Sequence, residues 1–113
     1  MMQYKEVTDY EINKTVAKYL KLNTIAHDRT GIVLFDDMDA TPFDPCNNPA
    51  DAMPIIIEHK ICMAYDVFAE DRDGGSWVAQ PAYGFSDERV RSDNYYRAAM
   101  ICFLMMKDAE NES

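Results

Sequence analysis

The chain has 113 residues, of which 48% are hydrophobic and 27% are charged. This length and composition predict one globular domain over residues 1–113 and exclude two independent hydrophobic cores, because small chains bury too little surface to stabilise each half. The 20 acidic and 11 basic residues give a formal net charge of −9, which disfavours binding to nucleic acid or to an anionic membrane. No stretch approaches the roughly 20 apolar residues that span a bilayer.

Cysteine usage and the start of the chain predict a cytoplasmic protein. Cys46, Cys62 and Cys102 are odd in number and contain no Cys-x-x-Cys pair. A small secreted domain normally carries an even disulfide framework, so we expect reduced thiols. Residues 1–6 are polar and do not resemble the apolar core of a secretory signal.

The first expected elements are a helix over residues 8–22 and a strand over residues 32–35. Thr8 and Glu11 have the spacing of a capping box, in which the hydroxyl accepts a hydrogen bond from a backbone N–H three residues further on. Apolar residues then recur at helical spacing. Ile-Val-Leu-Phe at 32–35 is rich in β-branched and aromatic residues, which favours a strand.

A loop is expected over residues 36–45, because proline lacks a backbone donor and aspartate competes for backbone hydrogen bonds. Asp36, Asp37 and Asp39 predict an acidic surface on this loop. The same carboxylates allow two functional alternatives, a calcium or magnesium site and an imitation of nucleic acid. A calcium loop beginning at Asp37 would lack the glycine and glutamate of an EF-hand, so we expect a solvated acidic face and no metal site.

A second helix is expected over residues 48–58. Asn48 fits the N-cap position, the following proline fits the first helical position, and Asp51 lies near the positive end of the helix dipole. Pro54 is expected to kink this helix. Three isoleucines at 55–57 leave a strand as the alternative there.

The next two elements are expected to form a β-hairpin. Apolar residues alternate with small or polar ones over residues 60–68, which predicts a strand with one buried face. Asp-Gly-Gly within 70–75 predicts the turn, because turns need the positive φ angles that glycine adopts readily. The return strand is expected over 76–83, and Pro81 indicates that it ends early or lies at an edge.

A last helix is expected over residues 94–109, capped by Ser92 or Asp93. Residues 98–106 contain no polar residue, so this helix must be covered on more than one side. The cover can come from the sheet and the other helices. It can also come from a second copy or a partner, which predicts a possible homo-oligomer through residues 96–106.

The order of elements is helix, strand, helix, strand, strand, helix. This order predicts an α+β domain in which a small antiparallel sheet packs with helices, expected on both of its faces. The polar tail over 107–113 is expected to fray.

The candidate chemistry of the sequence is sparse. His27, Cys46 and His59 are scattered, whereas zinc ligands occur at short spacing and a thiol–histidine pair needs an orienting group, so we expect structural roles. No glycine-rich phosphate loop and no Gly-x-Ser-x-Gly motif is present, and we expect neither a cofactor nor a catalytic residue.

Basic and aromatic residues combine near the last helix. Arg89, Arg91 and Arg97 accompany Tyr95 and Tyr96. Such a set can bind single-stranded nucleic acid, or its arginines can hold the phosphates of a nucleotide. The net charge favours instead a helix start whose tyrosines pack inward.

Two segments resemble the phage NinX-like family. They are residues 46–58, Cys-Asn-Asn-Pro-Ala-Asp-Ala-Met-Pro-Ile-Ile-Ile-Glu, and residues 96–106, Tyr-Arg-Ala-Ala-Met-Ile-Cys-Phe-Leu-Met-Met. Residues 9–17 are similar to the start of that family, whereas Met53 stands where the family is expected to have tryptophan. The resemblance implies a small accessory protein of tailed phages and prophages, with an antiparallel sheet held between helices, and it names no catalytic residue.

We therefore predict a non-enzymatic accessory protein that binds a host or phage macromolecule, with a protein favoured over nucleic acid. Asn47, Asn48, Asp51 and Arg97 are the candidate binding residues. A small-ligand protein that sequesters a nucleotide is the second hypothesis. A metal-dependent hydrolase at the acidic loop is the third.

Overall fold

The fold consists of helices and short strands, most of them connected by short segments. Helix caps and β-branched runs in the sequence mark where many of them form. The computed structural model describes residues 4–82 and 89–112. In chain order its elements are η1 (Tyr4–Glu6), α1 (Asp9–Tyr19), β1 (Thr24–His27), β2 (Ile32–Phe35), α2 (Pro49–Glu58), β3 (Ile61–Tyr65), η2 (Asp71–Asp73), β4 (Trp77–Pro81), β5 (Val90–Ser92) and α3 (Tyr95–Glu112). The predicted α+β class is confirmed, but the order of helices and strands is α-β-β-α-β-β-β-α.

The five strands form two antiparallel sheets rather than the single sheet expected. Strand β1 pairs with β2, and the second sheet has the order β3-β4-β5. Strands β1 and β5 were not predicted. Unlike the similarly short β2, neither is a continuous run of β-branched, aromatic or other apolar residues.

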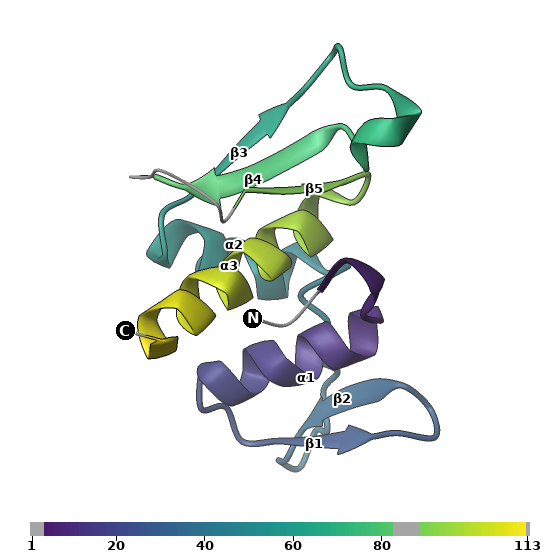
Figure 1. Cartoon of the computed structure of the whole chain (residues 1–113). Coiled ribbons are helices and arrows are strands. Elements are labelled where there is room, and N and C mark those ends of the chain that lie inside the picture. Colours follow the sequence, from purple (N-terminus) through teal and green to yellow (C-terminus); the bar gives the residue numbers. More distant parts are fainter. Residues whose placement is uncertain (1–3, 83–88, 113) are drawn as a thin grey trace.

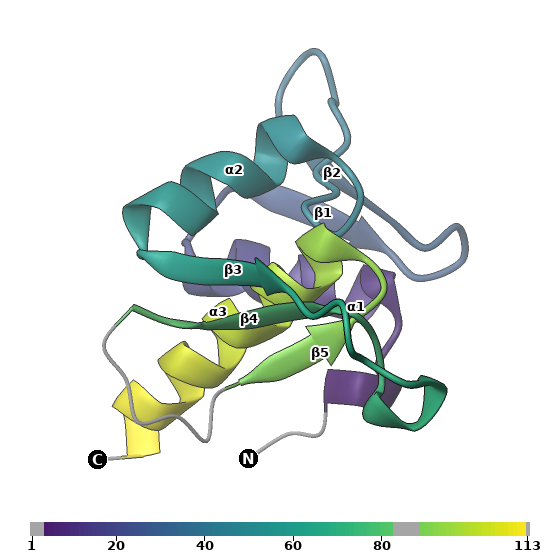
Figure 2. The same cartoon turned by 90° about the horizontal axis from the view of Figure 1, so that it is seen from above.

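The helices lie between the two sheets (Figure 1). Helix α3 packs against all three strands of the β3-β4-β5 sheet and against α1 and α2, while α1 contacts β2. Figure 2 shows the same arrangement from above, with α3 beneath the three-stranded sheet. Each sheet therefore has helices on one face, and the expectation of helices on both faces of one sheet is wrong. The outer face of β3 is accordingly open, and Cys62 and Ala64 on it are exposed.

The apolar part of α3 is covered within one chain. Every residue from Ala98 to Leu104 is at most 4% exposed. The sheet covers one side of this segment, and α1 and α2 cover the others. Assembly through residues 96–106 stays a prediction, since the apolar side chains that suggested it have partners within the chain.

Both ends of α3 differ from the prediction. Asn94 caps the helix, because its side-chain oxygen accepts hydrogen bonds from the backbone N–H groups of Tyr96 and Arg97 at 2.9 and 3.2 Å. The helix continues through Glu112, so residues 107–112 are helical where a frayed tail was expected. Asp108 stabilises these last turns by accepting hydrogen bonds from the hydroxyls of Tyr4 and Tyr19, each at 2.6 Å. No helix in the described ranges is both long and apolar enough to cross a membrane.

Helix α2 forms where strand was the alternative. Its cap is the predicted one, because the Asn48 side chain accepts from the N–H of Ala50 at 3.0 Å. Ile55 and Ile56 are buried, so packing of one helical face outweighs the β-propensity of the isoleucine run. Pro54 lies inside the helix on its exposed side.

The connection between β3 and β4 begins earlier than expected. Strand β3 ends at Tyr65 instead of Phe68, and Asp66 starts a tight turn by accepting a hydrogen bond from the N–H of Phe68. Arg91 pairs with the same carboxylate at 3.0 Å. Strand β4 ends at Pro81 as that proline indicated, and Tyr83, the expected end, lies outside the described residues.

Candidate binding pocket

The N-terminal ends of three helices meet in one polar cluster. Asp9 is the first residue of α1, Asn47 precedes the cap of α2, and Asn94 caps α3. The Asn47 amide donates to the Asp9 carboxylate at 3.2 Å, and the Asn94 amide donates to the Asn47 side-chain oxygen at 3.2 Å. Helix N-termini carry partial positive charge, so carboxylates among them are favourable.

The Asn47 side chain has a single consistent orientation. Its nitrogen lies 3.1–3.2 Å from both oxygens of Asp44, in addition to Asp9. Exchanging the amide oxygen and nitrogen would place an oxygen against two carboxylates and a nitrogen against the Asn94 donor. The network therefore fixes which atoms of Asn47 face the carboxylates.

Asn13 is a buried member of the network that was not predicted. It is 5% exposed, its amide donates to Asp44 at 2.7 Å, and its side-chain oxygen accepts from the backbone N–H of Cys46 at 3.1 Å. These bonds satisfy a buried loop amide that no secondary structure pairs. The available signal in the sequence was an amide residue directly after Ile12 on the apolar side of α1.

Arg97 holds the N-terminal segment against α3. Its guanidinium pairs with Asp9 and donates to the backbone oxygens of Val7 and Tyr4. The side chain is 19% exposed. Arg97 therefore lies at the cluster, and its described contacts stabilise the fold.

The other two candidate residues lie at the margin of the cluster. Asn48 caps α2 through its side chain. Asp51 accepts a hydrogen bond from the backbone N–H of Asp44 at 3.0 Å, which ties the first turn of α2 to the preceding loop. The structure thus brings Asn47 and Arg97 together through Asp9, and it connects Asp51 to them through Asp44.

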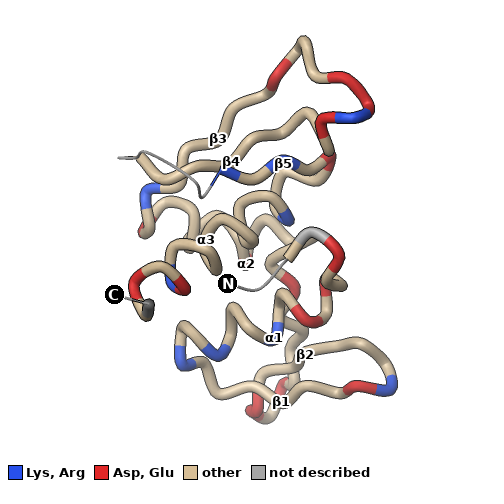
Figure 3. Tube along the Cα trace, in the orientation of Figure 1, with Lys and Arg blue, Asp and Glu red and all other residues tan. Residues whose placement is uncertain are grey.

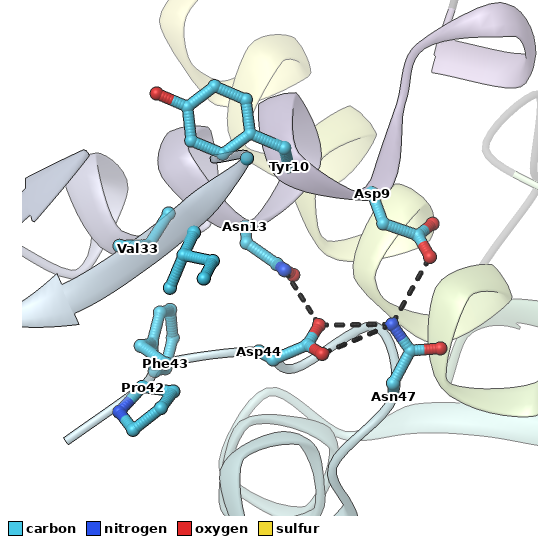
Figure 4. Close-up of a pocket in the computed structure, with 10 residues that line it drawn as sticks. Asp9, Tyr10, Asn13, Val33, Pro42, Phe43, Asp44 and Asn47 are labelled. Atoms are coloured by element: carbon cyan, nitrogen blue, oxygen red, sulfur yellow. Dashed lines mark hydrogen bonds between the residues drawn. The ribbon is translucent and has the colours of Figure 1, made fainter. Parts of the chain in front are cut away.

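A pocket of about 260 Å³ opens beside this cluster. Figure 4 shows the carboxylates and amides at one end and an apolar wall at the other. The lining residues are Asp9, Tyr10, Asn13, Gly31, Ile32, Val33, Pro42, Phe43, Asp44 and Asn47. They come from the first turns of α1, from the start of β2 and from the loop before α2, so the pocket joins segments that are distant in the sequence.

The comparison with protein families assigns the chain to a family. The family model described as "Bacteriophage P22, NinX" matches residues 3–107. The chain belongs to this family. No curated protein and no solved structure matches the chain. The match includes every lining residue of the pocket, so the pocket lies within the NinX region.

In the sequence of this NinX-family protein, the acidic loop directly precedes a segment that lines the pocket. Asp36, Asp37 and Asp39 are exposed on the segment between β2 and Pro42, which lines the pocket. The Asp37 carboxylate accepts from the N–H groups of Asp39 and Ala40 at 3.0 and 2.8 Å, which shapes the loop. Figure 3 shows acidic residues on this loop and on the turn around η2, at opposite ends of the NinX fold.

The thiol and imidazole groups have packing roles in the NinX fold. Burial raises the pKa of the Cys46 thiol, the nearby Asp9 carboxylate raises it further, and the thiol is therefore protonated at neutral pH. Burial lowers the pKa of His59, whose ring contacts Phe103 with centroids 4.8 Å apart. Among residues 4–82 and 89–112, no three His, Cys, Asp or Glu side chains gather closely enough to hold a metal ion.

None of the three arginines of the nucleotide hypothesis lines the pocket. Arg91 pairs with Asp66 on the three-stranded sheet, and Arg97 pairs with the pocket residue Asp9. Arg89 is exposed just before β5. The pocket itself presents Asp9 and Asp44, which repel phosphate groups.

Proposed function

We propose that this NinX-family protein is a phage accessory protein that binds a protein of the host or of the phage. The proposed contact surface is the hairpin face, defined as Ile25 and Ile32 on the outer side of β1–β2 together with Asp36, Met38 and Asp39 on the following loop. Exposed apolar groups beside carboxylates on this surface carry the proposal.

The apolar residues of the hairpin face are exposed, although the opposite face of the same hairpin packs on α1. Ile25 and Ile32 are 47% and 44% exposed, and Met38 is fully exposed. Ile25 pairs with Leu34 and Ile32 pairs with His27, so both isoleucines lie on the side of the hairpin that faces away from α1. Exposed apolar groups gathered on one face and rimmed by polar groups are typical of protein interaction sites.

The charge of the hairpin face favours a basic partner. Within the described residues, Asp36 and Asp39 form no ion pair with a Lys or Arg side chain. The chain as a whole carries a formal charge of −9. A partner with a basic surface would be attracted electrostatically within about one Debye length of the hairpin face. On contact it would bury the two isoleucines.

Charge reversal on the hairpin face tests this proposal. The tested variant is Asp36→Lys/Asp39→Lys, which leaves Asp37 in place because Asp37 shapes the loop. The matched control is Glu58→Lys/Asp71→Lys, which changes the net charge equally at exposed positions elsewhere. A partner is first captured from host or infected-cell lysate, identified by mass spectrometry and purified, and its affinity for each variant is then measured by calorimetry.

We expect the hairpin variant to bind the purified partner at least about 10-fold more weakly, and the control to bind within about twofold of the wild type. Raising the salt concentration should weaken the wild-type complex. Equal affinity of the two variants, or no protein enriched over the bare matrix, would overturn the proposal.

A further inference from the structure

We infer that the pocket beside Asp44 receives one basic side chain, a lysine or an arginine, from the partner protein. This inference rests on the proposed function and names the chemistry of the partner at one position. Pocket size, the apolar wall and the balance of donors and acceptors each support it.

The size of the pocket suits one side chain. Its volume is about 260 Å³, below the roughly 300–1,000 Å³ of pockets that enclose small-molecule ligands. Ile32 lines the pocket, is partly exposed and also belongs to the hairpin face. A partner lying on the hairpin face would therefore reach the pocket with a neighbouring side chain.

The wall of the pocket suits a methylene stem. Tyr10, Val33, Pro42 and Phe43 line it, and Phe43 is fixed by an edge-to-face contact with Phe35 at 5.6 Å. The Tyr10 hydroxyl donates to Asp28, which raises the pKa of Tyr10 to about 12 and keeps the ring neutral. Long basic side chains commonly lay their apolar stems along such surfaces while the charged end meets a polar group.

The polar end of the pocket has spare acceptors. Two carboxylates have roughly eight lone-pair sites, and the described hydrogen bonds to the side chains of Asp9 and Asp44 occupy five. The side-chain oxygens of Asn13 and Asn47 already accept from Cys46 and Asn94. A ligand that donates several hydrogen bonds therefore matches what this end offers.

Of the two carboxylates at the polar end of the pocket, one forms an ion pair within the described residues and the other does not. Arg97 pairs with Asp9, whereas no Lys or Arg in the described part of the chain forms an ion pair with the half-buried Asp44. An anionic ligand would be repelled, and an apolar one would remove water from Asp44 without replacing its hydrogen bonds, which is unfavourable. A lysine or arginine supplies both the positive charge and the donors.

Two short peptides test the inference directly. The probes are acetyl-Gly-Arg-Gly-amide and the same peptide with citrulline, which keeps the shape of arginine and removes its charge. Each is titrated into the ¹⁵N-labelled protein, and the side-chain NH₂ signals of Asn13 and Asn47 are followed by NMR. We expect the arginine peptide to shift these signals with a dissociation constant of about 1 mM, and citrulline to bind at least about 10-fold more weakly.

Two variants connect the response to the pocket. Asp44→Asn should abolish the shifts, and Ile32→Lys should weaken the peptide at least about fivefold by adding a positive charge beside the pocket. Because Ile32 is half exposed, its variant is expected to fold even if Asp44→Asn does not. The charge control Glu58→Lys/Asp71→Lys should retain the shifts of Asn13 and Asn47, since neither residue lines the pocket.

Peptide shifts that are absent, that lie outside the pocket, or that are equal for arginine and citrulline would overturn the inference. Such a result would leave the proposed function intact if Asp36→Lys/Asp39→Lys still lost the protein partner. Conversely, pocket shifts without any captured partner would overturn the proposed function while showing that the pocket selects basic groups.

Discussion

Arg97 connects α3 to the N-terminal segment, two parts of the chain that are far apart in the sequence. It pairs with Asp9 at the start of α1 and donates to backbone oxygens of Val7 and Tyr4, all from the first turn of α3. The Val7 oxygen lies between η1 and α1, and a backbone oxygen that is shielded from water needs such a donor. The residue is thus a structural tie as well as a neighbour of the pocket.

Arg97→Ala should lower the free energy of unfolding by about 2–4 kcal/mol. Removing one partner of a well-buried ion pair costs about 3–5 kcal/mol, and the partial exposure of this pair reduces the cost. The measurement is urea denaturation. Arg72→Ala is the control, because the Arg72–Glu70 pair is exposed, and it should change stability by less than about 0.5 kcal/mol. Equal losses in the two variants would contradict the structural role of Arg97.

How well the role of each residue could be predicted depends on how far away its hydrogen-bond partners lie in the sequence. Thr8 and Asn48 were predicted as caps correctly, because a cap bonds to an N–H two or three residues away. Asn13 bonds to Asp44 and Cys46, which lie in a distant loop, so one sequence contains no record of the contact. Asn47 and Arg97 were named as candidate binding residues, but their proximity in one cluster and their connection through Asp9 were not predicted.

Helix α2 shows how an element tolerates an unfavourable residue. Asn48 and Pro49 fix its start, and Ile55 and Ile56 anchor its buried face. Pro54 lies between the capped start and the buried isoleucines, and it removes one intrahelical hydrogen bond there. Packing of the isoleucines therefore holds the helix together across the proline.

Pro54→Ala should stabilise the protein by about 1–2 kcal/mol. Alanine restores the missing donor, and the gain is smaller than the roughly 3 kcal/mol difference in helix propensity because proline also restricts the unfolded chain. Thermal unfolding followed by circular dichroism measures it. Pro49→Ala is the matched control at the first helical position, where no donor is needed, and it should give no gain. A lower melting temperature for Pro54→Ala would show that the proline is favourable in place.

Elements with a strong local signal were predicted better than those without one. The helices, β2 and the β3–β4 hairpin show caps, periodicity or β-branched runs in the sequence, whereas β1 and β5 exist because of pairing with β2 and β4. A local pattern cannot report that pairing. The same limit explains the single predicted sheet, since strand partners are chosen by tertiary packing.

The whole molecule is organised around α3. This helix contacts the three-stranded sheet, α1 and α2, and the β1–β2 hairpin packs on α1 through β2. His59, at the end of α2, packs its ring on Phe103 of α3. Groups at this centre affect the stability of the entire fold, whereas the hairpin depends on fewer contacts.

The stability of the protein should decrease as the pH falls below about 6.5. Burial lowers the pKa of His59 in the folded state, so the unfolded chain takes up a proton first as the pH decreases. The stability is therefore fully present above the unfolded pKa and is lost as the pH falls toward the folded pKa. Melting temperatures between pH 5 and 8 measure this slope for the wild type and for His59→Gln.

His59→Gln should flatten the slope in this window, and His27→Gln, a change at an exposed position on β1, should keep it. If both variants retained the wild-type slope, the dependence would come from groups other than His59.

The unequal burial of the three cysteines allows the molecule to be labelled at one chosen position. Cys46 and Cys102 are buried, whereas Cys62 is exposed on the outer face of β3, across the molecule from β1 and β2 (Figure 1). A maleimide fluorophore would thus attach at Cys62 without mutation and without covering the pocket. Fluorescence anisotropy of this single dye could then follow association with any binding protein in real time.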